Sequence, residues 1–103
     1  MKGIDRMNHA IESQNNDQKK ISDKCEEIKE LLLQKNKAYG SSALDPINIF
    51  YDGDPSAGIK VRIDDKLKRI NNVGINDETE DSLKDLVGYL ILLMISRDES
   101  NNI

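Results

Sequence analysis

Two pairs of carboxylates have the spacing of residues that share one face of a helix. Glu27 and Glu30 lie three positions apart, and Asp81 and Asp85 lie four apart. Residues at these spacings are neighbours on a helix surface. If the two helices pack side by side, all four carboxylates converge, and such a cluster needs a cation because like charges raise one another's pKa values. Mg²⁺ prefers oxygen ligands of this kind. The spacing is therefore compatible with a magnesium site at these four residues, although ordinary acids on solvated faces have the same spacing more often.

A run of basic residues precedes the second carboxylate pair and could bind phosphate. Arg62 and Lys66 are the members that we expect to do so, Arg62 through its bidentate guanidinium. The alternative is pairing with Asp64 and Asp65 on a solvated surface. The basic residues of this run are Lys60, Arg62, Lys66, Lys68 and Arg69.

Asn36 and Tyr39 come just before a glycine-marked loop that begins at Gly40. The tyrosine ring could stack on a nucleotide base, and the amide could recognise the edge of the base. Alternatively, Tyr39 closes the core over the end of a helix. Both interpretations remain open from the residue types alone.

Apolar side chains predict the helices that must position these groups. The segment 78–95 opens with acids and is apolar on nearly every face from Leu83 to Ile95. A helix of this kind must be covered by other helices or by another subunit, and it is too short to span a bilayer. We expect it to be the central helix of a small bundle, capped by Asp77 or Thr79.

Two further apolar stripes have helical spacing. The first follows residue 18 and ends near 36–40, and it places Cys25 in the core. The second follows Asp54 and Pro55, a pair typical of a helix start. The members of these stripes are Ile21, Cys25, Ile28 and Leu32, and then Ile59, Ile63, Leu67 and Ile70.

The fold class that follows is all-α, because no strand pattern of any length is present. We expect three main helices plus a weak amino-terminal one. Residues 1–17 form a loosely packed segment in this interpretation, residues 18–97 a single helical domain, and residues 98–103 a frayed tail. Oligomerisation would complete the thin core that 103 residues with 37% hydrophobic content provide.

Charge and cysteine usage limit the classes of function. A formal charge of −4 and a pI near 4.9 argue against broad duplex nucleic-acid binding. The single cysteine excludes an intrachain disulfide, and the amino-terminal residues lack the apolar region of a secretory signal. We therefore expect a cytoplasmic protein that does not enter a membrane.

Three segments, in this order, give the chain a family resemblance. They are 35–40 (KNKAYG), 58–72 (GIKVRIDDKLKRINN) and 77–91 (DETEDSLKDLVGYLI). Together they resemble the nucleotide modification associated domain 1 family, which is common in phages and is similar to the MazG-like all-α NTP pyrophosphatases. The matching residues are Asn36, Tyr39 and Gly40; Arg62, Asp65, Lys66 and Arg69; and Asp77, Glu78, Asp81, Asp85 and Tyr89.

The resemblance implies a dimeric helical unit that binds a nucleotide, often through Mg²⁺. MazG-type relatives carry E-x-x-E on one helix and E-x-x-D on another. Glu27 and Glu30 match the first motif, whereas Ser82 stands where the second motif has its first acid. With a metal bound, Glu27, Glu30 and Asp85 would serve hydrolysis of a nucleoside triphosphate to the monophosphate and pyrophosphate.

Two other functions remain open from the sequence. One is a phage protein that has lost catalysis and sequesters a nucleotide or inhibits a host defence protein such as a CRISPR nuclease. Ser82 and the acidic composition favour this alternative. The other is a purely structural oligomerisation domain.

Overall fold

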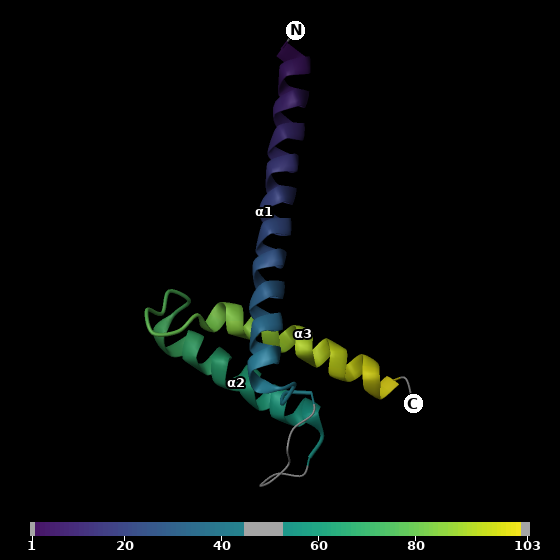
Figure 1. Cartoon of the computed structure of the whole chain (residues 1–103). Helices are drawn as coiled ribbons and strands as arrows, with labels where there is room; N and C mark the ends of the chain where they lie inside the picture. Colours follow the sequence, from purple (N-terminus) through teal and green to yellow (C-terminus); the bar gives the residue numbers. More distant parts are fainter. Residues whose placement is uncertain (1, 45–52, 102–103) are drawn as a thin grey trace. The chain divides into compact units, whose positions relative to one another are not determined.

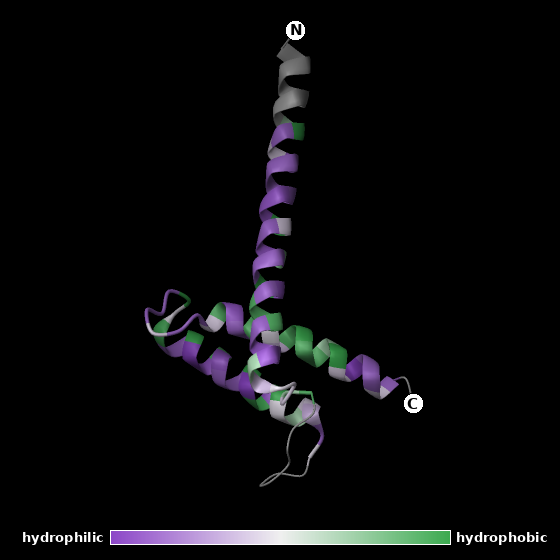
Figure 2. Cartoon of the chain, viewed as in Figure 1, coloured by the Kyte–Doolittle hydropathy of each residue, from purple (hydrophilic) through white to green (hydrophobic). Residues whose placement is uncertain are grey.

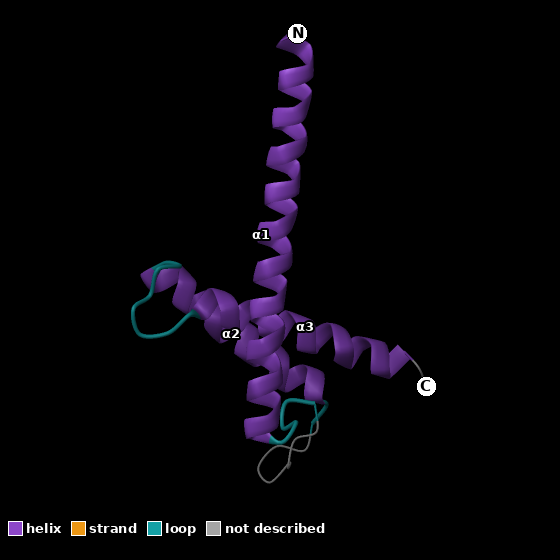
Figure 3. Cartoon of the chain, turned by 45° about the horizontal axis from the view of Figure 1, so that its top comes forward, coloured by secondary structure: helices purple, strands orange, loops and turns teal. Residues whose placement is uncertain are grey.

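The computed structural model describes the backbone of residues 2–44 and 53–101, and the side chains of residues 10–44 and 53–101. It contains three helices: α1 (Lys2–Tyr39), α2 (Pro55–Val73) and α3 (Ser82–Asn101) (Figure 1). Figure 3 shows helices and loops, and no strand occurs among these residues. The prediction of an all-α fold is confirmed.

The expected separate amino-terminal helix is part of α1, which runs without a break from Lys2 to Tyr39. The polar run 13–17 does not interrupt it, because positions 4–39 contain neither glycine nor proline. Pairs of opposite charge one turn apart also support the helix. They are Lys19 with Asp23 at 3.0 Å, Lys24 with Glu27 at 2.7 Å, and Glu26 with Lys29 at 3.6 Å.

The carboxyl end of α1 lies where the sequence predicts it. Gly40 has a φ of 58°, in the left-handed region that favours glycine. The amide of Ser41 then donates to the carbonyl oxygen of Asn36 at 3.2 Å, the hydrogen bond of a Schellman motif. This turn fixes the direction in which the chain leaves the helix.

The chain divides into two compact units, Met1–Leu31 and Leu32–Ile103. The first unit is a single helix. Of its apolar stripe, Ile28 is buried, whereas Ile21 and Cys25 are exposed, so the prediction that Cys25 belongs to a core is wrong. The second unit contains the last two turns of α1 together with α2 and α3, and it holds the candidate site.

Helices α2 and α3 form an antiparallel hairpin joined by residues 74–81 (Figure 1). Asp54 caps α2 by accepting a hydrogen bond from the amide of Ser56 at 3.0 Å, as the sequence predicts. At the other end, Gly74 has a φ of 83° and its amide donates to the carbonyl of Ile70 at 2.8 Å. Both ends of α2 are therefore fixed by local sequence.

The inner face of α2 differs by one position from the expected apolar stripe. Ile59 is buried, and Ile63 and Ile70 are half-buried. Leu67, however, is 50% exposed, and the side chain of Lys66 takes the inward position with only 18% exposed. A helix with 3.6 residues per turn places 66 closer than 67 to the line through 59, 63 and 70. A lysine therefore occupies a core position.

Helix α3 begins at Ser82, four residues after the predicted start. Asp81 caps it, accepting a hydrogen bond from the amide of Lys84 at 3.0 Å, so the expectation of a cap at Asp77 or Thr79 is wrong. Residues 98–101, expected to be frayed, continue the helix. Figure 2 shows hydrophobic residues along its middle. No helix in the described part of the chain combines the length and apolar character that a membrane span requires.

Gly88 allows α1 and α3 to approach closely within the second unit. A Cβ atom added at Gly88 would lie 2.9 Å from the Cδ2 atom of Leu32, closer than real side chains come. Gly58 in α2 has no neighbour within 4 Å of the equivalent point. Alanine at either glycine raises helix propensity, but only alanine at Gly88 meets a neighbour, so comparing the two substitutions separates the effect of propensity from that of packing.

We expect Gly88→Ala to be less stable than Gly58→Ala by about 1 kcal/mol or more. Both substitutions gain helix propensity, about 0.8–1.0 kcal/mol, but only the first crowds a neighbour. Urea unfolding followed by circular dichroism measures the difference. Equal stabilisation of the two variants would contradict the close packing of Leu32 on Gly88.

Candidate functional site

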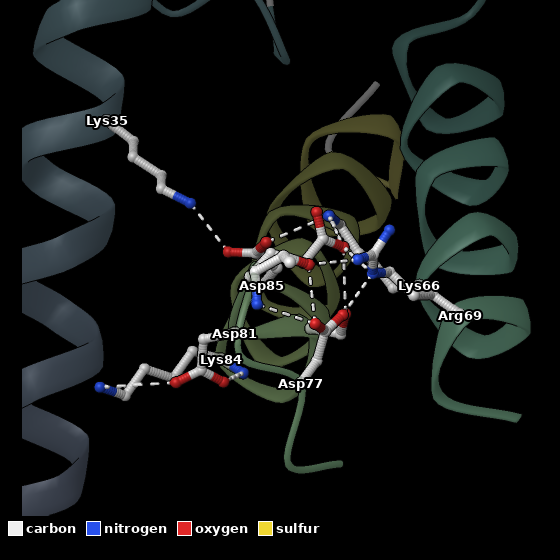
Figure 4. Close-up of polar contacts among 10 residues, drawn as sticks. Lys35, Lys66, Arg69, Asp77, Asp81, Lys84 and Asp85 are labelled. Carbon is white, nitrogen blue, oxygen red and sulfur yellow. Dashed lines mark hydrogen bonds and ion pairs between the residues drawn. The ribbon is translucent and has the colours of Figure 1, made fainter. Parts of the chain in front are cut away.

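Six charged residues meet where α2, α3 and the end of α1 come together in the second unit (Figure 4). We call them the charge cluster. Three are cationic and three are anionic, so their formal charges cancel. The members are Lys35 from α1, Lys66 and Arg69 from α2, Asp77 and Glu80 from the connecting loop, and Asp85 from α3.

Lys66 lies at the centre of the charge cluster, between two carboxylates. Its Nζ atom is 3.1 Å from Oε1 of Glu80 and 3.1 Å from Oδ2 of Asp85. Because both carboxylates belong to the loop and first turn that follow α2, this one ammonium joins the two arms of the hairpin. It is the inward lysine described above.

Asp85 receives a lysine on each oxygen. Its Oδ1 atom is 2.9 Å from the Nζ of Lys35, and its Oδ2 atom is the one that contacts Lys66. Lys35 extends from the last turns of α1 (Figure 4). Asp85 therefore connects all three helices of this unit.

Arg69 holds the loop between α2 and α3. Its guanidinium donates to the carboxylate of Asp77 and to the hydroxyl of Thr79, and its Nε atom is 3.1 Å from Oε1 of Glu80. The amide and hydroxyl of Thr79 donate to Asp77 at 2.9 and 2.7 Å. Asp77 thus organises a tight turn instead of capping α3.

The charge cluster is buried at its centre and accessible at its edges. Only 7% of the Asp77 side chain, 17% of Asp85 and 18% of Lys66 is exposed. Lys35 and Arg69 remain open to solvent over a larger part of their side chains. A ligand could therefore reach cationic groups on two sides of the cluster without opening the hairpin.

The contacts hold the cluster in its ionised form. The guanidinium of Arg69, and then Thr79, lower the pKa of Asp77 well below its usual range. A hydrogen bond from Lys66, followed by one from Ser82, lowers the pKa of Glu80. Burial opposes ionisation of Asp85, but hydrogen bonds from Lys35 and Lys66 outweigh it and lower the pKa. For Lys66, burial is likewise outweighed by Glu80 and Asp85, which raise its pKa.

Of the residues predicted to form the site, Lys66 and Asp85 are in direct contact. Asp81 is not part of the charge cluster, because its carboxylate caps α3 and lies 3.7 Å from the Nζ of Lys84. Arg62 is exposed on α2, one helical turn before Lys66. Arg62 as a second phosphate ligand stays a prediction.

Asn36 and Tyr39 lie on the last turn of α1. The amide of Asn36 donates to the hydroxyl of Ser41 at 3.0 Å and helps to close the turn after the helix. The side chain of Tyr39 is accessible, because the residue is 71% exposed, so it does not close a core. Its ring could stack on a base, as proposed from the sequence.

Glu27 and Glu30 belong to the first unit, so the predicted cluster of four carboxylates draws on both units. Glu27 lies 2.7 Å from Lys24, and Glu30 is exposed. Within the part of the chain that the structure describes, neither unit alone brings together three or more His, Cys, Asp or Glu residues that could hold a metal. Since both oxygens of Asp85 are taken by lysines, the second unit by itself does not fit Mg²⁺, and the magnesium site stays a prediction.

No sequence pattern marks Lys35 or Glu80 as functional residues. Glu80 falls in the expected first turn of α3, which begins later in the structure, and Lys35 belongs to no apolar stripe or carboxylate pair. The spacing in the sequence could have indicated Arg69. It lies three residues after Lys66, so an inward Lys66 brings Arg69 toward the same acids.

Comparison of the chain with protein-family models, with curated proteins and with solved structures gives no match. The family resemblance is thus supported by the three sequence segments alone.

The charge cluster makes stability depend on acid pH. The folded-state pKa values of Asp77, Glu80 and Asp85 are depressed, so their contribution is present above the unfolded values of about 4 and is lost as the pH falls toward the folded values. We expect the free energy of unfolding to fall from about pH 5 downward, and to fall less steeply in Asp77→Asn.

Urea unfolding at a series of pH values measures this dependence. Asp64→Asn, at an exposed position of α2 outside the cluster, is the control and should follow the parent protein. If Asp77→Asn and the parent protein have parallel profiles, the Arg69–Asp77 pair does not contribute as described.

Proposed function

We propose that this chain is a nucleotide-binding protein whose charge cluster receives the phosphates. The proposal rests on one observation: the cluster joins side chains from all three segments of the family resemblance. Lys35 comes from the first segment, Lys66 and Arg69 from the second, and the three carboxylates from the third.

The use of buried positions supports a binding role over a purely structural one. Ile59 is the one large apolar side chain of α2 and α3 that is fully buried among the described residues, while Lys66, Asp77 and Asp85 occupy interior positions. Replacing a buried ion pair by apolar residues is often neutral or stabilising. A small protein that retains charges where its core is thin gains little stability from them, and charged groups held in this way are characteristic of functional sites.

The chemistry of the cationic groups fits phosphate. Lys35, Lys66 and Arg69 provide two ammonium groups and one guanidinium, and each is already oriented toward an anion. Phosphate oxygens accept the same charge-assisted hydrogen bonds as carboxylates. Binding would exchange carboxylate partners for phosphate oxygens, beginning at the exposed Lys35 and Arg69, and the accessible ring of Tyr39 could stack on the base.

Hydrolysis to the monophosphate and pyrophosphate is the further step that the resemblance implies. It requires Mg²⁺, which would activate a water and offset charge on the leaving group. The second unit lacks a metal site of its own, so this step depends on Glu27 and Glu30 joining Asp85. Sequestration of a nucleotide without hydrolysis needs only the charge cluster.

A thermal-shift experiment with a panel of nucleoside mono-, di- and triphosphates tests binding. A ligand at one hundred times its Kd stabilises by about 2.7 kcal/mol, and each kcal/mol raises Tm by about 4–8 °C in a domain of this size. We expect Lys35→Gln to reduce this shift. Lys37→Gln, two residues along α1, is the matched control and should leave the shift unchanged.

Pyrophosphate release with Mg²⁺ and each stabilising nucleotide, with Asp85→Asn as control, separates hydrolysis from sequestration. Absence of stabilisation by every nucleotide would refute the proposed function. Equal losses in Lys35→Gln and Lys37→Gln would show that the charge cluster is not where the phosphates bind.

A further inference from the structure

The carboxylate of Glu80 uses only one of its two oxygens for hydrogen bonds within the charge cluster. Lys66 and Ser82 each donate to Oε1 at 3.1 Å, and the Nε atom of Arg69 lies 3.1 Å from the same oxygen. No hydrogen bond from the residues that the structure describes reaches Oε2. Three contacts on one oxygen fix the orientation of the carboxylate, so Oε2 is held in place as an available acceptor.

The other two carboxylates of the charge cluster have no such oxygen. Asp85 is contacted by a lysine on each of its oxygens. Asp77 accepts from Arg69 on Oδ2 and from Thr79 on Oδ1. Among the three acids, Glu80 is therefore the one that can accept a hydrogen bond from a ligand without losing a contact that it already makes.

Arg69 provides a donor next to this acceptor. Its Nε and Nη2 atoms donate to Asp77 and Thr79, whereas Nη1 donates no hydrogen bond within the described part of the chain. The contact between Nε and Oε1 joins the two side chains, so Nη1 and Oε2 each lie two bonds away from atoms that already touch. With 33% of the Glu80 side chain and 40% of the Arg69 side chain exposed, a ligand can reach both groups.

A ligand at this edge of the charge cluster must satisfy two opposite requirements. Lys66 and Arg69 favour a negative charge, since they form charge-assisted hydrogen bonds with anionic oxygens. The carboxylate of Glu80 disfavours a negative charge, because like charges that face one another repel. An anion that retains a proton meets both requirements: one of its oxygens accepts from the guanidinium, and its O–H group donates to Oε2.

We propose that Oε2 of Glu80 and Nη1 of Arg69 select a hydrogen phosphate over an anion that carries no proton. This inference rests on the proposed function, since it takes the charge cluster as the phosphate site, and it names the form of phosphate that the site accepts. The terminal phosphate of a nucleotide and free inorganic phosphate share this chemistry. Sulfate has the same tetrahedral shape without the proton, so comparing it with phosphate isolates the contribution of the O–H group.

A pH of about 6 suits the comparison, because a phosphate monoester is then about half protonated, whereas sulfate carries no proton. A hydrogen bond from Lys66 keeps the pKa of Glu80 below its ordinary value, so the carboxylate stays ionised under these conditions. Nuclear magnetic resonance titrations of the ¹⁵N-labelled chain measure the affinities, with sodium chloride holding the ionic strength constant.

We expect inorganic phosphate to bind at least about tenfold more tightly than sulfate, since sulfate leaves an oxygen facing the carboxylate of Glu80. The same preference is expected for a nucleoside 5′-monophosphate over its 5′-sulfate ester. These two pairs of anions distinguish free phosphate from a nucleotide as the ligand.

Glu80→Gln removes the requirement for a proton, because an amide can donate as well as accept. We expect this variant to bring the ratio of phosphate to sulfate affinity close to one. Glu78→Gln, at an exposed acid two residues earlier in the same loop, is the matched control and should keep the ratio of the parent protein. Circular dichroism verifies that both variants fold, and the ratio in the parent protein is decisive even if Glu80→Gln does not.

Equal affinities for phosphate and sulfate in the parent protein would overturn this inference, as would an unchanged preference in Glu80→Gln, and nucleotide binding would still stand. A preference for inorganic phosphate without binding of any nucleotide would refute the proposed function and support the selection of hydrogen phosphate. Binding of none of the four anions would overturn both.

Discussion

The second unit depends on a single ammonium group held between two carboxylates. Lys66 contacts Glu80 at the end of the loop and Asp85 in the first turn of α3, each at 3.1 Å. Because the loop and α3 both follow α2 in the chain, these contacts fix the direction in which α3 returns along α2. Lys35 then binds the other oxygen of Asp85 and attaches the end of α1 to the same point. A hairpin that closes on a charge instead of an apolar side chain is oriented by directional contacts, which specify geometry more than they add stability.

This constraint explains why the fold was easier to predict than the site. Helix type and most helix ends follow from local sequence: the Asp54–Pro55 start of α2 and the Gly40 end of α1 are each set by a few neighbouring residues. The charge cluster depends instead on the rotation of α2 about its axis. Counting apolar residues favoured Leu67 as the inward residue, whereas the structure turns Lys66 inward. The difference is one residue, and no local signal decides between them, since the acids that attract Lys66 are 14 and 19 positions further along the chain.

The start of α3 shows how a competing interaction alters a predicted boundary. Asp77, Thr79 and Asp81 all have side chains suited to capping a helix. Arg69 binds Asp77 and Thr79 and holds both in the loop. Asp81 is the next acceptor in the chain and becomes the cap, so the helix begins four residues late. The sequence therefore shows that the acids of this segment are important. It does not show which of them forms the turn, which caps α3 and which joins the charge cluster, because that depends on where Arg69 lies on the preceding helix.

The distribution of polar and apolar side chains around α3 connects these observations. Its inward side binds two lysines through Asp85 and makes room for Leu32 at Gly88, and only some of its larger apolar residues are exposed. The apolar surface of α3 is divided, because Leu86, Leu92 and Leu93 are half-buried whereas Leu83, Leu90 and Met94 are exposed. The rotation of the helix that turns Asp85 toward Lys66 therefore also decides which of its apolar side chains are buried and which stay accessible.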